Sequence, residues 1–125
     1  MRASLQLSPV RQSHLSQASL AALRGLLIAE TATQAARRAE HEALVGRLRD
    51  LTDADSVLER ELAEAGAARA RETTADVEHA LERLSNGSYG WCEDCGAPIP
   101  FERLEAIPWA RHCVACPGRR PGWQR

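Results

Sequence analysis

The chain has 125 residues, the length of one small domain or of a small domain with an extended arm. Its 16 basic residues, all Arg, and 17 acidic residues leave a net charge of −1, which excludes a generally basic nucleic-acid coat and a strongly acidic solvating chain. Hydrophobic residues make up 44%, but many are Ala, which buries little area, and only 4% are aromatic. A large globular core is therefore excluded, and we expect either long helices that pack together or a stabilising cross-link, for which the four Cys are candidates.

The sequence shows no targeting or membrane-spanning segment. The first five residues lack the apolar core of a secretory peptide. The most apolar run, residues 20–29, contains Arg24 and is too short to cross a bilayer. We therefore expect a cytoplasmic protein without a membrane partner. In that reducing compartment, closely spaced Cys pairs favour metal binding over disulfides.

Composition divides the chain into four segments. Residues 1–14 are polar and are expected to be a flexible lead-in, and residues 118–125 form a basic tail. Residues 15–85 contain no Pro and are rich in the strong helix formers Ala, Leu, Glu and Arg. Residues 86–117 contain every Cys, four of the six Pro and three of the eight Gly, as expected of a small metal-binding unit. Asn86 or Gly87 can adopt the left-handed conformation that ends a helix.

The helical segment is expected to reverse direction near its middle. Residues 50–56 combine three Asp with a Thr and a Ser, which are poor in helix interiors and good at helix N-termini. Ser56 and Glu59 also have the spacing of a capping box. One uninterrupted helix would extend about 105 Å. The break instead favours a mainly α fold, an antiparallel helical hairpin with its tip near residues 50–56.

Apolar residues recur every three or four positions in both arms, which suits an antiparallel coiled coil. Facing Ala residues allow a close approach but bury little area, so we expect modest stability. The expected seam comprises Leu15, Ala18, Ala22, Leu26, Ala29, Ala36, Ala43, Leu44 and Leu48 in the first arm, and Leu58, Leu62, Ala65, Val77, Ala80, Leu81 and Leu84 in the second.

The four Cys form a C-x2-C-x17-C-x2-C pattern, typical of a C4 zinc finger. Four thiolates fill the tetrahedral shell of Zn²⁺ and leave no position for a reactive water, so such a site is structural. We therefore expect one structural zinc per chain and no enzymatic activity. The alternatives are redox-active or free thiol pairs, and a site in which His112 replaces one Cys. The expected ligands are Cys92, Cys95, Cys113 and Cys116.

The residues around the Cys pairs predict how the finger folds. A short helix over residues 101–106 should stop before Pro108, and Gly90 and Gly96 should relax the backbone beside the first pair. Tyr89 and Trp91 are expected to pack the finger against the hairpin base, with stacking on nucleic acid as the alternative. The expected small core comprises Ile99, Leu104, Ile107 and Trp109, and the side chains expected to offset the zinc–thiolate charge are Arg103, Arg111 and His112.

The segment from Tyr89 to Cys116 closely resembles the zinc finger of the DksA/TraR family. The shared pattern is Tyr89-Gly90-x-Cys92-x-x-Cys95-Gly96-x-x-Ile99, then Arg103-Leu104-Glu105-Ala106-x-Pro108-x-Ala110-x-x-Cys113-x-x-Cys116. In that family a long helical hairpin precedes the finger. The resemblance implies a bacterial transcription regulator that binds RNA polymerase rather than DNA. The hairpin would enter the secondary channel, bring an acidic tip near the active site and modulate initiation.

The resemblance also implies a functional tip, whose register has more than one solution. The family pattern is Asp-x-x-Asp-x-Ala, and Asp50 and Asp53 supply both acids, with Asp55 where the Ala is expected. Ungapped counting from the first Cys instead places Ala54 on the family Ala, and a further shift places Asp55 on the second Asp. Asp50, Asp53 and Asp55 are therefore the candidate tip residues. The alternative is that these acids are only helix caps.

Two further questions concern partners. The best-known family members act with the alarmone ppGpp, and those that respond fully continue into a helix after the last Cys. Residues 117–122 are too rich in Pro and Gly to form one here, which makes a ppGpp partner doubtful. The competing functions are a nucleic-acid-binding finger, a structural coiled-coil adaptor and a transcript-cleavage stimulator. The first is disfavoured because residues 50–82 carry ten acids and three Arg, which would repel phosphates.

Overall fold

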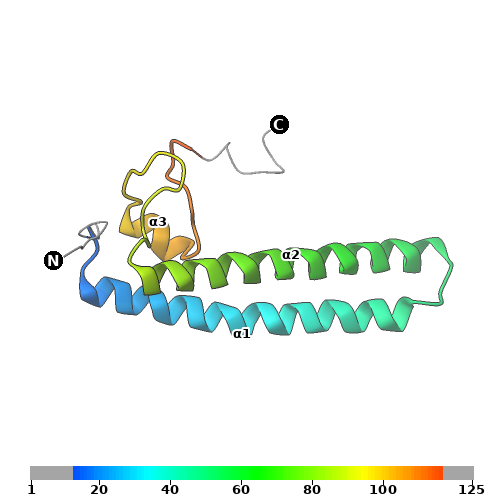
Figure 1. Cartoon of the computed structure of the whole chain (residues 1–125). Helices are drawn as coiled ribbons and strands as arrows, with labels where there is room; N and C mark the ends of the chain where they lie inside the picture. The colour runs from blue at the N-terminus through cyan, green and yellow to red at the C-terminus, as the bar shows by residue number, and fades with distance from the viewer. Residues whose placement is uncertain (1–12, 117–125) are drawn as a thin grey trace.

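The computed structural model describes residues 13–116. Helix α1 spans Gln17–Leu48, α2 spans Ala54–Asn86 and the short α3 spans Phe101–Ala106. Figure 1 shows α1 and α2 running antiparallel, with the finger at one end of the hairpin and the connecting turn at the other. The mainly α class and the antiparallel hairpin are thus confirmed. The expectations for residues 1–12 and 117–125 lie outside the described residues.

Polar side chains and one glycine define the helix ends. Ser16 caps α1 by accepting a hydrogen bond from the Ser19 amide at 3.0 Å. Asp53 caps α2 through the Ser56 amide, also at 3.0 Å, so the expected Ser56–Glu59 capping box is wrong and Ser56 lies inside the first turn. Helix α2 ends at Asn86 and is capped by Gly87, whose φ of 84° is the left-handed conformation expected there.

The face of α1 that contacts α2 repeats every seven residues, the period of a coiled coil. Leu27 is fully buried, Gln34 is 5% exposed and His41, seven residues further on, is half-buried. The facing part of α2 consists of small residues, which let the two backbones approach closely. These small residues are Ala63, Gly66, Ala67 and Ala70.

The expected seam is therefore wrong for most of α1 and for the first half of α2. Leu26, Leu58 and Leu62 are 43%, 56% and 63% exposed. Spacing alone does not distinguish the inner face of a helix from its outer face, whereas close packing requires small residues at the contact. Ala18, Ala22, Ala29, Ala36, Ala43 and Ala65 are also exposed, while Leu15, Val77 and Ala80 are buried as expected.

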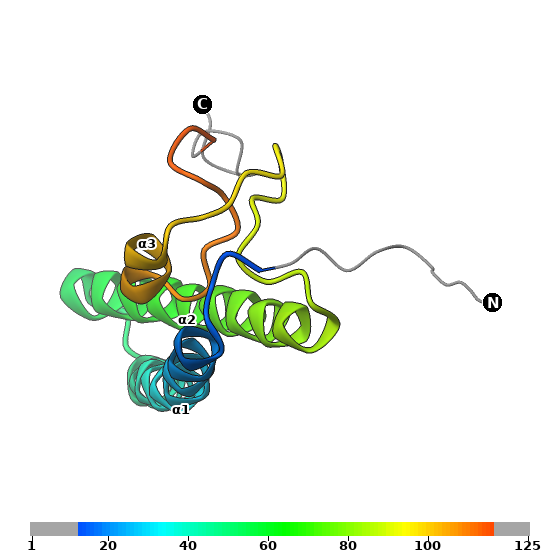
Figure 2. The same cartoon turned by 90° about the vertical axis from the view of Figure 1, so that its left-hand side faces the viewer.

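The finger and the hairpin base share one apolar cluster. Leu23 and Leu27 of α1 and Val77 of α2 pack in the same cluster as Ile99 and Leu104 of the finger, and all five are fully buried. Figure 2, from the finger end, shows the finger covering one side of the hairpin base. The expected core needs one correction, because Ile107 is 38% exposed at the end of α3.

Within residues 13–116, no helix is both long enough and apolar enough to span a membrane.

Candidate metal centre and hairpin tip

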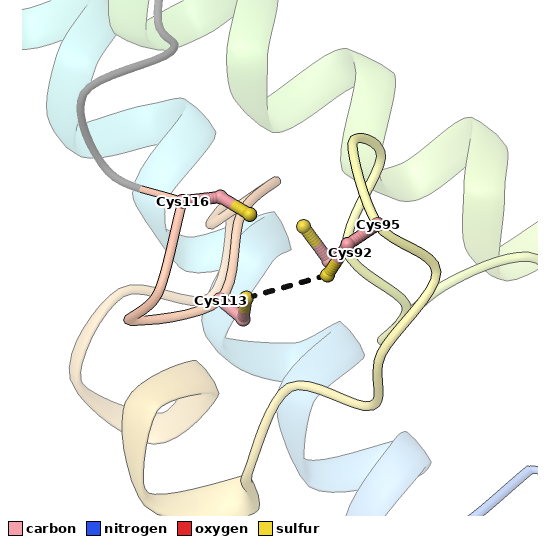
Figure 3. A group of neighbouring side chains, drawn as sticks. All are labelled: Cys92, Cys95, Cys113 and Cys116. Carbon is pink, nitrogen blue, oxygen red and sulfur yellow. Dashed lines mark hydrogen bonds between the residues drawn. The ribbon is translucent and has the colours of Figure 1, made fainter.

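Each Cys pair lies on a tight turn. The first is closed by the Gly96 amide, which donates to the Cys92 carbonyl at 2.9 Å, and Gly96 has a φ of 76°. The second is closed by the Cys116 amide, which donates to the Cys113 carbonyl at 3.0 Å. The Glu93 amide donates to the Arg111 carbonyl at 2.8 Å and joins the two turns. The local sequence therefore aims the four sulfurs at a common point (Figure 3).

The distances between sulfurs match what zinc requires. All four Sγ atoms lie within 4.8 Å of one another, and Cys95 Sγ lies 3.6 Å from Cys113 Sγ. A tetrahedral zinc with Zn–S bonds of about 2.3 Å places its sulfurs roughly 3.8 Å apart. All four Cys are free thiols rather than disulfides, and the group does not include His112. This donor set and its closed geometry fit one structural zinc.

Backbone amides around Cys92 favour its thiolate form. Burial disfavours its thiolate, but the backbone amides of Cys95, Cys113 and Asp94 donate hydrogen bonds to it and lower the pKa of Cys92 to about 6. Zinc binds the thiolate form of Cys. The folded backbone thus offers the metal at least one ligand in its reactive form near neutral pH.

Two buried residues fix the start of the finger. Tyr89 is 4% exposed, and its hydroxyl donates to the Pro108 carbonyl at 2.8 Å. Arg83 is 9% exposed, and its Nη2 donates to the Ser88 and Trp91 carbonyls at 2.5 and 2.8 Å. Tyr89 also belongs to the apolar cluster that the finger shares with the hairpin base, so its expected packing role is observed.

Ion pairs add a second connection between α2 and the finger. Glu93, beside the first Cys, accepts a hydrogen bond from His79 Nε2 at 2.5 Å and lies 3.3 Å from Arg83 Nη1. Arg111 Nη2 pairs with Asp76 of α2 at 2.8 Å. Arg111 therefore ties the finger to the hairpin.

The segment before α1 also contacts the finger. His14 Nε2 donates to the Ile99 carbonyl at 2.8 Å, and its ring meets Trp91 edge-on with centroids 4.9 Å apart. Gly90 has a φ of 94°, and an added Cβ there would lie 3.1 Å from Leu15 Cδ1. The close approach of this segment thus depends on a glycine in the left-handed conformation.

At the far end of the hairpin, the three candidate acids occupy different positions. Asp50 is exposed in the turn after α1, Asp53 is the N-cap of α2 and Asp55 lies in the first turn of α2. Hydrogen bonds from Ser56 to the Asp53 carboxylate lower the pKa of Asp53 below its usual range. Capping accounts for Asp53, and Asp55 in the first turn suits the positive end of the α2 dipole, which leaves Asp50 as the candidate acid without a role at the start of α2.

Several decisive residues were not singled out from the sequence. Arg83, Glu93 and His79 carry contacts that join segments 8 to 14 residues apart, and His14 reaches a residue 85 positions away. Charged residues are common throughout the chain, so composition gives them no distinguishing signal. Gln34 and His41, on the face of α1 that contacts α2, could have been found from the sequence, because they follow Leu27 at intervals of seven residues.

Comparison with known proteins adds the family of the finger. Residues 87–121 match the family described as the prokaryotic dksA/traR C4-type zinc finger. The RNA polymerase-binding transcription factor DksA of Caulobacter vibrioides is 39% identical over 77 residues, or 61% of this chain and 54% of that protein. General stress protein 16O of Bacillus subtilis is 50% identical over 44 residues, 35% of this chain and 27% of that protein. The matched region thus spans about half the length of the Caulobacter protein and about a quarter of the Bacillus protein.

The fold has a counterpart among solved structures. The transcription factor DksA2 of Pseudomonas aeruginosa superposes with a TM-score of 0.74 at 27% sequence identity. The match covers 85% of each chain, so it includes the hairpin as well as the finger. The arrangement of a long helical hairpin with a small unit packed at its base is therefore shared.

Proposed function

We propose that this chain is a transcription regulator of the DksA/TraR type that binds RNA polymerase, because its residues 87–121 match the C4-type zinc finger of that family and its fold matches that of DksA2. The observation that carries the proposal is the extent of the structural match, which spans 85% of both chains. A shared finger alone would support only a shared metal site. A shared hairpin of matching layout supports a shared mode of action.

The geometry suits insertion into a narrow channel. Helices α1 and α2 have 32 and 33 residues, which corresponds to arms of about 50 Å at 1.5 Å per residue. The finger and the base form one broad surface, and the tip lies at the opposite end (Figure 1). In our proposal the finger and base bind the outside of the polymerase, while the hairpin enters the secondary channel and its tip approaches the active site.

The proposed zinc role follows from the packing of the finger. Cys92, Cys95, Cys113 and Cys116 hold one Zn²⁺, which keeps the two turns together and thereby fixes the apolar cluster at the base. Binding energy at such a site is folding energy, because the separated turns have little core of their own. Zinc thus supports polymerase binding by holding the finger surface in shape.

The proposed tip role concerns charge near the catalytic metal of the polymerase. A carboxylate placed there would perturb the ligand and water network of that metal. Asp50 is the leading candidate because it is exposed and lies outside the cap. Asp53 and Asp55 remain candidates because each lies within five residues of Asp50.

The test compares binding with effect on initiation for the variants Asp50→Asn, Asp53→Asn and Asp55→Asn. Asn caps a helix almost as well as Asp, so α2 should keep its start in the Asp53 variant. We expect polymerase affinity to stay within a few-fold in every variant. The effect on open-complex lifetime should fall by about tenfold or more for Asp50→Asn, equivalent to roughly 1.4 kcal/mol or more of activation free energy. Glu59→Gln in α2 is the matched control for loss of one acid.

Three outcomes would contradict parts of the proposal. Absence of polymerase binding by the zinc-loaded wild type would reject the function as a whole. Full activity of all three Asn variants would show that the tip acids act only as helix caps. Salt-dependent binding to bare DNA would favour the nucleic-acid alternative, and stimulated RNA cleavage in backtracked complexes would favour a cleavage factor. Repeating the lifetime assay with and without ppGpp decides whether the alarmone is a partner.

A further inference from the structure

One side chain crosses the tip of the hairpin and binds the backbone on the other side. Arg60 lies in the second turn of α2, and its Nη1 donates to the carbonyls of Leu48, Arg49 and Leu51 at 2.8, 3.3 and 3.1 Å. Leu48 is the last residue of α1, and Arg49 is its C-cap. The last carbonyls of a helix have no partner within the helix, and they form the negative end of its dipole. The Arg60 guanidinium therefore binds carbonyls at the end of α1 that have no partner within the helix.

The three acceptors surround Asp50. Arg49 precedes it and Leu51 follows it, so the carbonyls of the two residues that flank Asp50 bind the same nitrogen. The turn is closed further by the Leu51 amide, which donates to the Leu48 carbonyl at 3.1 Å. Only Thr52 separates this anchored segment from Asp53, which is fixed as the cap of α2. The backbone that carries Asp50 thus has little freedom while Arg60 is in place.

We infer that Arg60 is a positioning residue that holds the Asp50 segment in a single conformation at the end of the hairpin. The inference rests on the proposed function for its consequence: an acid must be presented at one point to act on a catalytic metal. A mobile turn would spread the carboxylate over many positions and weaken its effect. Arg60 would therefore influence activity through Asp50 without contacting the polymerase active site.

The test uses the full-length, zinc-loaded protein with Arg60→Met, which keeps most of the stem but removes the charge and the donors. Arg60→Lys restores a cationic donor of similar reach. Arg47→Met is the matched control, because Arg47 is an exposed Arg in the last turn of α1. Amide exchange and backbone relaxation over residues 49–52 report the mobility of the turn. Polymerase affinity and open-complex lifetime report function, and circular dichroism verifies the helices.

We expect Arg60→Met to increase mobility at residues 49–52, to keep polymerase affinity within a few-fold and to lose most of the effect on lifetime. Arg60→Lys should recover much of both the rigidity and the effect, and Arg47→Met should resemble the wild type. Unchanged mobility in Arg60→Met would overturn the inference, and so would increased mobility with full activity. Equal losses of binding and activity would instead make Arg60 a polymerase contact. If Arg60→Met fails to fold, Arg60→Lys tests the inference instead. An Arg60→Lys protein with a rigid turn at residues 49–52 and no activity would overturn the inference.

The two proposals can fail separately. If the wild type does not bind polymerase, the proposed function is rejected, whereas the mobility measurements still decide whether Arg60 holds the turn. If the wild type is active and Arg60→Met behaves like it, the proposed function stands and the role of Arg60 is rejected.

Discussion

Gly66 offers a sharp test of how closely the two long helices pack. A Cβ added at Gly66 would lie 2.5 Å from His41 Cε1 and 2.6 Å from its Nε2, well inside contact distance. A Gly→Ala change in a helix interior ordinarily stabilises by about 1 kcal/mol. Overpacking of a close contact costs roughly 1–3 kcal/mol. We therefore expect Gly66→Ala to be neutral or destabilising by up to about 2 kcal/mol, with the clash cancelling the helix propensity.

The chain provides its own control in Gly25, another glycine inside a helix. An added Cβ at Gly25 would meet nothing within 4 Å, so Gly25→Ala should raise the free energy of unfolding by about 1 kcal/mol. Urea unfolding of the zinc-loaded variants, followed by far-UV circular dichroism, measures both changes. Gly66→Ala should become stabilising when His41→Ala is already present, with a coupling free energy of about 1–3 kcal/mol. Equal stabilisation by Gly25→Ala and Gly66→Ala in the wild-type background would refute the close contact.

Three further predictions concern the finger. Metal analysis should find one zinc per chain, and substoichiometric zinc in freshly reduced wild type would contradict this. Cys92→Ser should lose the zinc and, with it, the packing of the apolar cluster, which a change in Trp fluorescence would report. Burial raises the pKa of Tyr89 to about 12. Its contribution to stability should be complete below its ordinary pKa of about 10 and be lost as the pH rises toward the folded value. Tyr89 is the only Tyr, so an ultraviolet titration with a midpoint near 10 would contradict this burial. Arg83→Met leaves the partly buried Ser88 and Trp91 carbonyls without their donor, and we expect a loss of about 1–3 kcal/mol in urea unfolding. A loss no larger than that of the exposed control Arg69→Met would argue against these buried bonds.

Local chemistry along the chain specifies the helices, their ends and the metal centre. Long runs of Ala, Leu, Glu and Arg specify helices, because these residues lose little side-chain freedom in a helix. Asp53 and Gly87 mark helix ends because a short carboxylate satisfies free amides and a glycine accepts a positive φ. The Cys spacing specified the metal centre because each C-x2-C turn is closed within four or five residues. These features need no knowledge of distant contacts.

Tertiary structure alone decided which helix faces meet and what fixes the two ends of the hairpin. Leu58 and Leu62 have the spacing of a seam, yet they face solvent, because α1 approaches α2 where Gly66 and its Ala neighbours leave room. Polar Gln34 and His41 fill positions that hydrophobicity alone assigns to apolar residues. Arg60 is one of 16 Arg in the chain, and only the reversal of the chain brings its guanidinium to the end of α1. A helix pattern fixes a period, whereas the rotation and offset of two helices depend on shapes that meet only after folding.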